Sequence, residues 1–288
     1  MKKIQLLASG YLDDKDERIK WYTERKSKEF IGPLHLDLFG QSKYLLPGVD
    51  VRIKLTRSKS NFQLLTDATE KGVKTVIEEA VLYVRRVKVT PSVLLGHQIG
   101  LKENNAIYTI QQSDLQTYTI SQGSKSHIQD NLFRGVLPKM LFVALVGNDA
   151  FNGNMTKDPL TFDHFNINYL ALFREGESIP YSQPLQPDFE GGFIARAYMQ
   201  MIQSLEMFNV NQNNGITMDQ FKGGKTVFAF NLTPDLCASG PCGQSYKTGN
   251  LRLEMKFAKA LAAAINVIVF AIRDGKIEIT KDRQVLKS

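Results

Sequence analysis

Cysteine is scarce in this sequence, and its scarcity removes several classes of protein. The 288 residues include only two cysteines, Cys237 and Cys242. Two are too few for a disulfide framework or a four-cysteine zinc site. A half zinc site would need a second ligand pair, and none has a fitting spacing, so we expect two free thiols in a loop.

Histidine is also rare, and no pair of histidines has metal-ligand spacing. There is no His-x-His and no His-Glu-x-x-His motif among the four, which are His35, His97, His127 and His164. A catalytic metal needs three or four converging ligands. The sequence therefore predicts no metal site.

No hydrophobic run is long enough to cross a bilayer. The longest nearly apolar stretch, 260–272, has 13 residues and contains Asn266, whereas a transmembrane helix needs roughly 20. The basic and then apolar start of the chain gives way after eight residues to Ser9-Gly10 and an acidic pair, which disfavours a secretory signal. We expect no membrane partner.

The usual catalytic motifs are missing as well. There is no Gly-x-Ser-x-Gly elbow, and the Gly-Gly-Lys-Thr string at 223–226 lacks the upstream glycine that a phosphate-binding loop needs, because Asp219 stands five residues before Gly224. This string is most simply a turn into a strand. Aspartates such as Asp149, Asp158 and Asp188 sit beside Asn or Pro, where Asp commonly shapes turns, and nothing selects two carboxylates as an acid and base pair. The sequence predicts no enzyme, with no catalytic and no cofactor-binding residues and no cofactor.

Positive charge is concentrated in the first third of the chain. The formal net charge is +7, and residues 1–90 hold 18 Lys and Arg against 12 Asp and Glu, while the remainder holds 18 against 17. A basic face can contact a polyanion such as DNA. It can equally be solvated surface, and both interpretations stay open here.

What the sequence has in abundance is short segments with the period-two alternation of half-buried strands. In 49–55, Val49, Val51, Ile53 and Leu55 share one face and charged residues the other. We predict similar strands at 34–38 and 81–89. The later candidates are 107–110, 117–120, 140–146, 167–173, 226–230, 251–257, 265–272 and 277–280, the last two joined by an Asp274-Gly275 hairpin turn.

Few helices interrupt the strands. Thr90-Pro91 is typical of an N-cap followed by proline in the first turn, and Thr217 with Gln220 has capping-box spacing. An apolar stripe predicts one long helix at about 192–209, whose Met-containing face we expect in the core. Many strands without alternating helices indicate an antiparallel β-sandwich.

Six strings taken in order carry a resemblance to a known family, and the resemblance covers nearly the whole chain. They are IGPLHLDLF (31–39), YLLPGVDV (44–51), LYVRRVKVTPSV (82–93), NLFRGVLPK (131–139), PLQPDF (184–189) and GNLRLE (249–254). In this order they resemble the capsid proteins of Polinton (Maverick) elements and adintoviruses, which are found integrated in invertebrate genomes as endogenous viral elements.

The resemblance implies an all-β fold and a structural role in a virion. It implies a double jelly roll, hexon-like major capsid protein that forms a homotrimer and contacts neighbouring capsomers and penton or minor capsid proteins. Residues 1–104 would be the C-terminal part of the first jelly roll with a closing short helix. Residues 105–288 would be the second roll, with the long helix inserted. Localisation would be the virion, or the host nucleus or cytoplasm when the chain is expressed.

The sequence departs from the family at its start, because members begin upstream with strands that open the first roll, and Met1 falls inside that roll. An incomplete roll leaves unpaired edges and exposed apolar faces. We expect a truncated gene model, a decayed copy or a shortened product.

Two alternatives remain from the sequence. One is a penton-type minor capsid protein with a single jelly roll that forms pentamers. The other is a β-sandwich module that binds a glycan or another ligand, although the single Trp21 lies far from the strand-rich region. For contacts between subunits, the loops 151–164, 178–192 and 209–224 are candidates.

Overall fold

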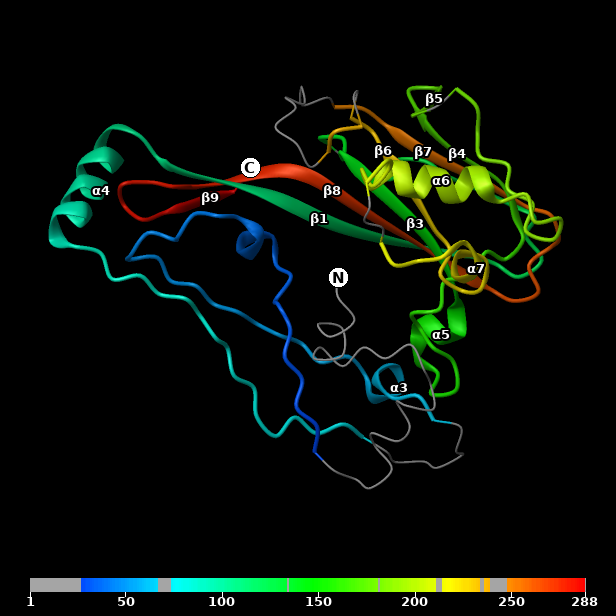
Figure 1. The fold of residues 1–288 in the computed structure, drawn as a ribbon, viewed down its shortest axis with the longest axis horizontal. Coiled ribbons are helices and arrows are strands. Elements are labelled where there is room, and N and C mark those ends of the chain that lie inside the picture. Colours follow the sequence, from blue (N-terminus) through cyan, green and yellow to red (C-terminus); the bar gives the residue numbers. More distant parts are fainter. Residues whose placement is uncertain are drawn as a thin grey trace.

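The structure is a computed structural model of the chain. It describes residues 27–66, 74–133, 135–180, 182–210, 214–233, 236–238 and 248–287. Most of the regular structure is β, arranged in two antiparallel sheets at one end of the molecule (Figure 1). No helix of the described residues is long and apolar enough to cross a membrane.

The strand order of the two sheets is that of a jelly roll. One sheet runs β1 (Ala106–Ile120), β8 (Ile265–Ile279), β3 (Met140–Gly147) and β6 (Val227–Asn231), with β9 (Val285–Lys287) beside β8. The other runs β2 (Ser126–Gln129), β7 (Leu251–Phe257), β4 (Ile167–Arg174) and β5 (Glu177–Ile179). All paired neighbours are antiparallel. Eight antiparallel strands divided between two sheets in the orders β1-β8-β3-β6 and β2-β7-β4-β5 form a jelly roll.

The core of the molecule lies between these two sheets. In β7 every second residue is buried, so that Leu251, Leu253 and Met255 point inward. In β3, Leu141, Val143 and Leu145 do the same. The burial of β7 has the period-two alternation of a strand, whereas β3 is an apolar run that is buried at most of its positions. The strands predicted at 140–146, 167–173, 226–230 and 251–257 are confirmed to within a residue or two.

The long helix is shorter than its apolar stripe predicted. Instead of about 192–209, α6 spans Ala195–Ser204, ten residues. Gly192 at φ +82° makes the turn before it, and Glu206 and Asn209, both at positive φ, end the helical path after it. The face with Met201 lies in the core as expected, but Phe193 is 77% exposed.

Helix α6 also covers the free edge of β6, the last strand of its sheet. The Ala229 carbonyl oxygen, which points away from the sheet, accepts bonds from Ser204 Oγ at 2.9 Å and Gln200 Nε2 at 3.3 Å. Both side chains are buried. An edge covered in this way cannot pair with another chain.

The predicted hairpin at Asp274-Gly275 is wrong, because β8 continues straight through it. Asp274 and Gly275 pair with Gln111 and Ile110 of β1. A Cβ at Gly275 would come within 2.6 Å of the Gln112 side chain, so glycine serves close packing here rather than a turn. The chain reverses five residues later, where Arg283, at φ +61°, donates its N–H to the Thr280 carbonyl.

Strands β1 and β8 are each one continuous strand of 15 residues where the sequence predicted two shorter strands, and both extend beyond the sandwich. Strand β3 pairs only with 265–272 of β8, while β1 pairs with all of it. The remaining two-stranded part forms a ribbon with β9 beside it, and α4 (Pro91–Glu103) lies near its tip (Figure 1). The predicted start of α4 is confirmed: Thr90 is its N-cap and Pro91 its first residue.

The strands predicted at 34–38, 49–55 and 81–89 are wrong for this structure. Residues 27–66 and 74–104 contain no strand, only the short helices η1 (Asp37–Gly40) and α3 (Ser60–Gln63) and then α4. The backbone between them is extended, as alternation predicts, but a strand also needs a hydrogen-bonded neighbour about 4.8 Å away. The described residues supply none.

Two smaller predictions are confirmed. Thr217 and Gln220 form a capping box at the start of α7 (Met218–Lys222). Gly223 and Gly224 form the turn that leads from α7 into β6. The connection between β3 and β4 also holds α5 (Asn148–Gly153), which the sequence did not predict.

Candidate assembly surface

The most unusual surface of the molecule belongs to residues 27–66 and 74–104, which we call the arm. Nineteen of the thirty exposed large apolar side chains among the described residues lie in it, and none of its residues before Leu101 is buried. Tyr83 is 81% exposed and Leu55 72%. Because monomeric proteins seldom leave so much apolar surface in water, this arm is the candidate interaction surface.

The arm contacts the ribbon along β1, between Ile107 and Ser113. The Tyr108 hydroxyl of β1 donates to the Tyr44 carbonyl at 3.2 Å and accepts the Leu46 N–H at 3.1 Å. Close by, one oxygen of Asp37 accepts from the Ser113 hydroxyl at 2.7 Å and from its N–H at 3.2 Å. Sequence reasoning missed these contacts, because nothing local links residues more than sixty positions apart.

A second contact joins the arm to the opposite part of the roll. Helix α3 packs on α5, where Gly153, at φ +98°, lies against the backbone of Asn61 and Phe62. The Thr66 N–H donates to the Met155 carbonyl at 2.7 Å. Between its two contacts the arm runs as extended chain away from the sandwich (Figure 1).

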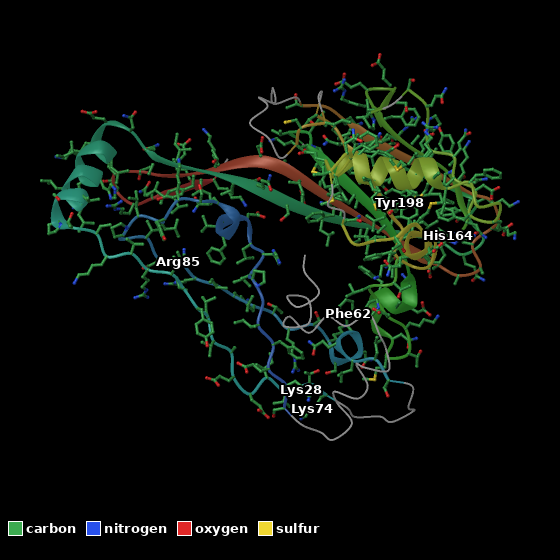
Figure 2. All side chains as sticks on the ribbon, in the orientation of Figure 1. Lys28, Phe62, Lys74, Arg85, His164 and Tyr198 are labelled. Carbon is green, nitrogen blue, oxygen red and sulfur yellow. The ribbon has the colours of Figure 1, made fainter. Side chains whose placement is uncertain are left out.

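Charged side chains behave differently in the arm and in the roll. The arm holds eleven Lys and Arg against six Asp and Glu, and no described ion pair includes any of its cations. Arg85 and Lys74 project from its extended segments (Figure 2). In the roll, by contrast, ion pairs are formed by Lys139, Lys157, Arg252, Lys259, Arg273 and Lys276.

The four histidines are distributed over separate elements. His35 precedes η1, His97 lies on α4, His127 on β2 and His164 before β4. Within the described ranges, no three His, Cys, Asp or Glu side chains converge so that they could hold a metal ion. Burial lowers the pKa of both His127 and His164 below its ordinary value.

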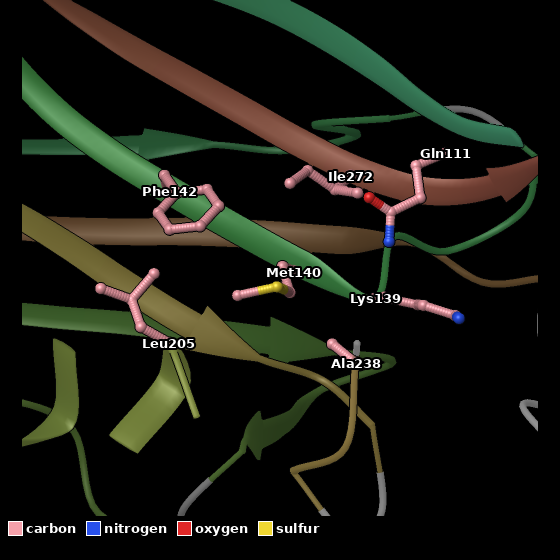
Figure 3. Close-up of a pocket in the computed structure, with 7 residues that line it drawn as sticks. All are labelled: Gln111, Lys139, Met140, Phe142, Leu205, Ala238 and Ile272. Atoms are coloured by element: carbon pink, nitrogen blue, oxygen red, sulfur yellow. The ribbon is translucent and has the colours of Figure 1, made fainter. Parts of the chain in front are cut away.

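One pocket of about 220 Å³ lies on the outer face of the first sheet (Figure 3). It is lined mainly by apolar side chains, among them Met140, Phe142 and Ile272. The ammonium group of Lys139 is its one charged group and is already paired with Asp274. The lining therefore offers neither a nucleophile nor an acid and base pair.

The expectation of two free thiols is wrong. Cys237 takes part in a disulfide, and the described residues include no free cysteine. Cys242, the only other cysteine in the sequence, lies outside the described residues. Spacing alone could not decide this, because disulfide formation depends on how the loop folds back.

Comparisons with known proteins give one relative in sequence and several in structure. No model of a known protein family matches the chain. The uncharacterized protein F54H12.2 of Caenorhabditis elegans is 27% identical over 246 residues, which cover 81% of this chain and 58% of that protein. The chain thus spans a little over half of that relative's length.

The structural neighbours are viral major capsid proteins. The mavirus major capsid protein has a TM-score of 0.38 and 14% identity, over 64% of this chain and 41% of its own. The Sputnik virophage structure has a TM-score of 0.38 and 16% identity, over 62% of this chain and 38% of its own. The PBCV-1 virus capsid has a TM-score of 0.38 and 10% identity, over 67% of this chain and 54% of its own. At these scores the likeness is loose, and the fold assignment rests on the strand order.

Proposed function

We propose that this chain is a structural subunit of a viral-type capsid, a hexon-like major capsid protein of a Polinton, Maverick or adintovirus-like element that acts without catalysis. The observation that carries the proposal is a contrast within one chain. The described strands between residues 106 and 279 form two sheets with a buried apolar core between them. The arm has the alternating sequence of strands, yet its apolar side chains are exposed.

The proposal assigns each part a place in a double jelly roll. Residues 1–104 are the C-terminal part of the first roll with α4 as its closing helix, and residues 105–288 are the second roll. The segments 49–55 and 81–89 become strands when further strands of the first roll lie beside them. Their free backbone groups and apolar faces support this, because both are satisfied by strand pairing.

The subunit count tests the proposal. We expect the product of the full reading frame that contains this chain to form homotrimers, as measured by native mass spectrometry or light scattering. Obligate interfaces of this kind bury more than about 2,000 Å², so the trimer should persist on dilution. A monomer at all concentrations would contradict a capsid role.

A penton-type minor capsid protein is a second candidate, because the described strands build one closed jelly roll. A pentamer in the same measurement would favour it over the hexon-like subunit. The β-sandwich ligand module remains a prediction from the sequence. Specific binding by a monomer on a glycan array would support it.

We further propose that the unpaired cations of the arm contact packaged DNA without sequence preference. Arg52 and Lys54 alternate with the apolar side chains of an extended segment and have no ion pair among the described residues. Each phosphate contact contributes about −0.9 to the slope of log affinity against log salt. Duplex DNA binding by the R52Q/K54Q double variant should have a slope smaller in magnitude by about 2.

The matched control is K157Q, because Lys157 is exposed on the roll and paired with Asp149. It should leave the slope unchanged. Salt-independent binding, or no binding of duplex DNA, would reject this contact.

A further inference from the structure

His164 holds an unusual turn just before β4. Its ring nitrogen Nδ1 accepts the backbone N–H of Asn166 at 2.9 Å, and its carbonyl accepts the N–H of Ile167 at 2.9 Å. The two central residues, Phe165 and Asn166, have φ of +45° and +53°. Two successive non-glycine residues in the left-handed region are costly, so the turn depends on bonds that fix it.

The imidazole is itself held by its surroundings. It stacks on Phe189, with ring centroids 4.0 Å apart and planes 2° from parallel, and Phe189 belongs to the core. The charged groups that face it are Asp163 on its own connection, Lys222 of α7 and Glu190 of the loop before α6. The ring therefore has little freedom to move its Nδ1 elsewhere.

The same turn joins three loops at one end of the roll. Glu190 accepts a bond from Asn166 Nδ2 at 3.1 Å and pairs with Lys259. The Asn166 carbonyl accepts the Ala258 N–H at 2.9 Å. Loss of the turn would consequently loosen the connection 148–166 from the loops that follow β5 and β7.

A proton on Nδ1 removes the bond that fixes the turn. Neutral imidazole accepts at one nitrogen, whereas both nitrogens of imidazolium are donors. Protonated Nδ1–H would then face the Asn166 N–H, donor against donor. Burial lowers the pKa of His164 from its ordinary 6.5 and Lys222 adds to this, while Asp163 and Glu190 oppose it. The ring is therefore neutral at pH 7 and takes up its proton only when the pH falls below the ordinary histidine value.

We propose that His164 is an acid-sensitive latch that closes the connection between β3 and β4 while its ring is neutral and opens it when Nδ1 is protonated. The connection carries α5, on which α3 of the arm docks. Opening the latch thus loosens one of the two contacts that hold the arm on the roll. This inference does not depend on the proposed capsid role.

Hydrogen exchange of the full chain tests the latch. Between about pH 7.5 and pH 5, exchange of the Asn166 and Ile167 amides, corrected for the intrinsic rate at each pH, should become about tenfold faster, which corresponds to the loss of one hydrogen bond. Amides in the centre of β7 should not change. If the corrected protection of Asn166 is the same at both pH values, the latch does not exist.

Two substitutions separate the effect of the hydrogen bond to Asn166 from the effect of the ring stacked on Phe189. H164N keeps an acceptor for the N–H two residues on, as in an Asx turn, but has no titrating group, so its protection should be independent of pH. H164F keeps the stack on Phe189 without an acceptor and should exchange fast at both pH values. H97N, on exposed α4, should behave like the parent chain. Persistence of the pH effect in H164N would overturn the proposal.

Discussion

His127 illustrates how a single polar residue tunes the stability of the sandwich. It lies on β2, and its Nε2 is buried with no hydrogen-bond partner in the described structure. A buried polar atom without a partner costs stability. The position therefore tolerates an apolar side chain better than a charged one.

We predict that H127L reduces the loss of folding stability as the pH falls. Because burial lowers the native pKa of His127, the unfolded chain takes up its proton first. The stability from this group is complete above about pH 6.5 and is lost as pH falls from there through the lower native pKa. Urea unfolding at about pH 7.5 and pH 5 should show that the free energy of unfolding falls less between these two pH values for H127L than for the parent chain.

The reference for this comparison is H97L, which changes an exposed histidine and should retain the parent's drop in stability. An identical drop in H127L and the parent would show that His127 does not contribute.

Phe221 is the residue on which the aromatic part of the core converges. It is fully buried, and its ring lies 5.8 to 6.2 Å from the rings of Phe189, Tyr198 and Phe228. We predict that F221A lowers the free energy of unfolding by about 3–5 kcal/mol, from lost burial and the cavity left behind. Denaturant titration measures this directly.

F193A is the matched control, because Phe193 is 77% exposed. It should change stability by less than about 0.5 kcal/mol. Equal effects of the two substitutions would mean that the core is not centred on Phe221.

At the scale of elements, α6 acts as the cover of a sheet edge. Its buried Gln200 and Ser204 are the two donors to the Ala229 carbonyl. We predict that the double variant Q200L/S204A, which leaves this carbonyl without its donors, destabilises the protein by about 2 kcal/mol. Thermal or urea unfolding measures the loss.

M199A, on the partly exposed face of α6, serves as its control and should have an effect below about 0.5 kcal/mol. If the double variant is as stable as the parent, the helix covers the edge through packing alone.

At the scale of the whole molecule, the arm and the roll differ in how well their backbones are protected from proteases. Extended, exposed chain without backbone pairing is cut first by proteases. We predict that trypsin cleaves the monomeric chain first between residues 27 and 104 and leaves a resistant fragment that begins close to β1. In an assembled oligomer, the same sites should be cut more slowly. An arm as resistant as the roll in the monomer would contradict this picture.

Alternation and capping residues predicted much of the roll without any structure. The strand around Leu253 follows from period-two alternation, the strands around Leu141 and Leu170 follow from short runs rich in apolar residues, and the capping box at Thr217 follows from two side chains three residues apart. These signals are local, so the sequence states them completely. The apolar alternation and the excess positive charge of residues 27–104 were also visible in the sequence, but they predicted strands there, and the absence of strand pairing among the described residues of this segment was not foreseen.

The sequence by itself determined which segments are extended, which faces are apolar and where α4 and α7 start. Only the tertiary structure decided pairing: that β8 runs through Asp274 and Gly275, that α6 stops at Ser204, and that the alternating arm finds no strand beside it. The physical reason is that a strand is completed by hydrogen bonds to a segment distant in sequence. The residues next to it in sequence do not determine whether such a segment lies beside it.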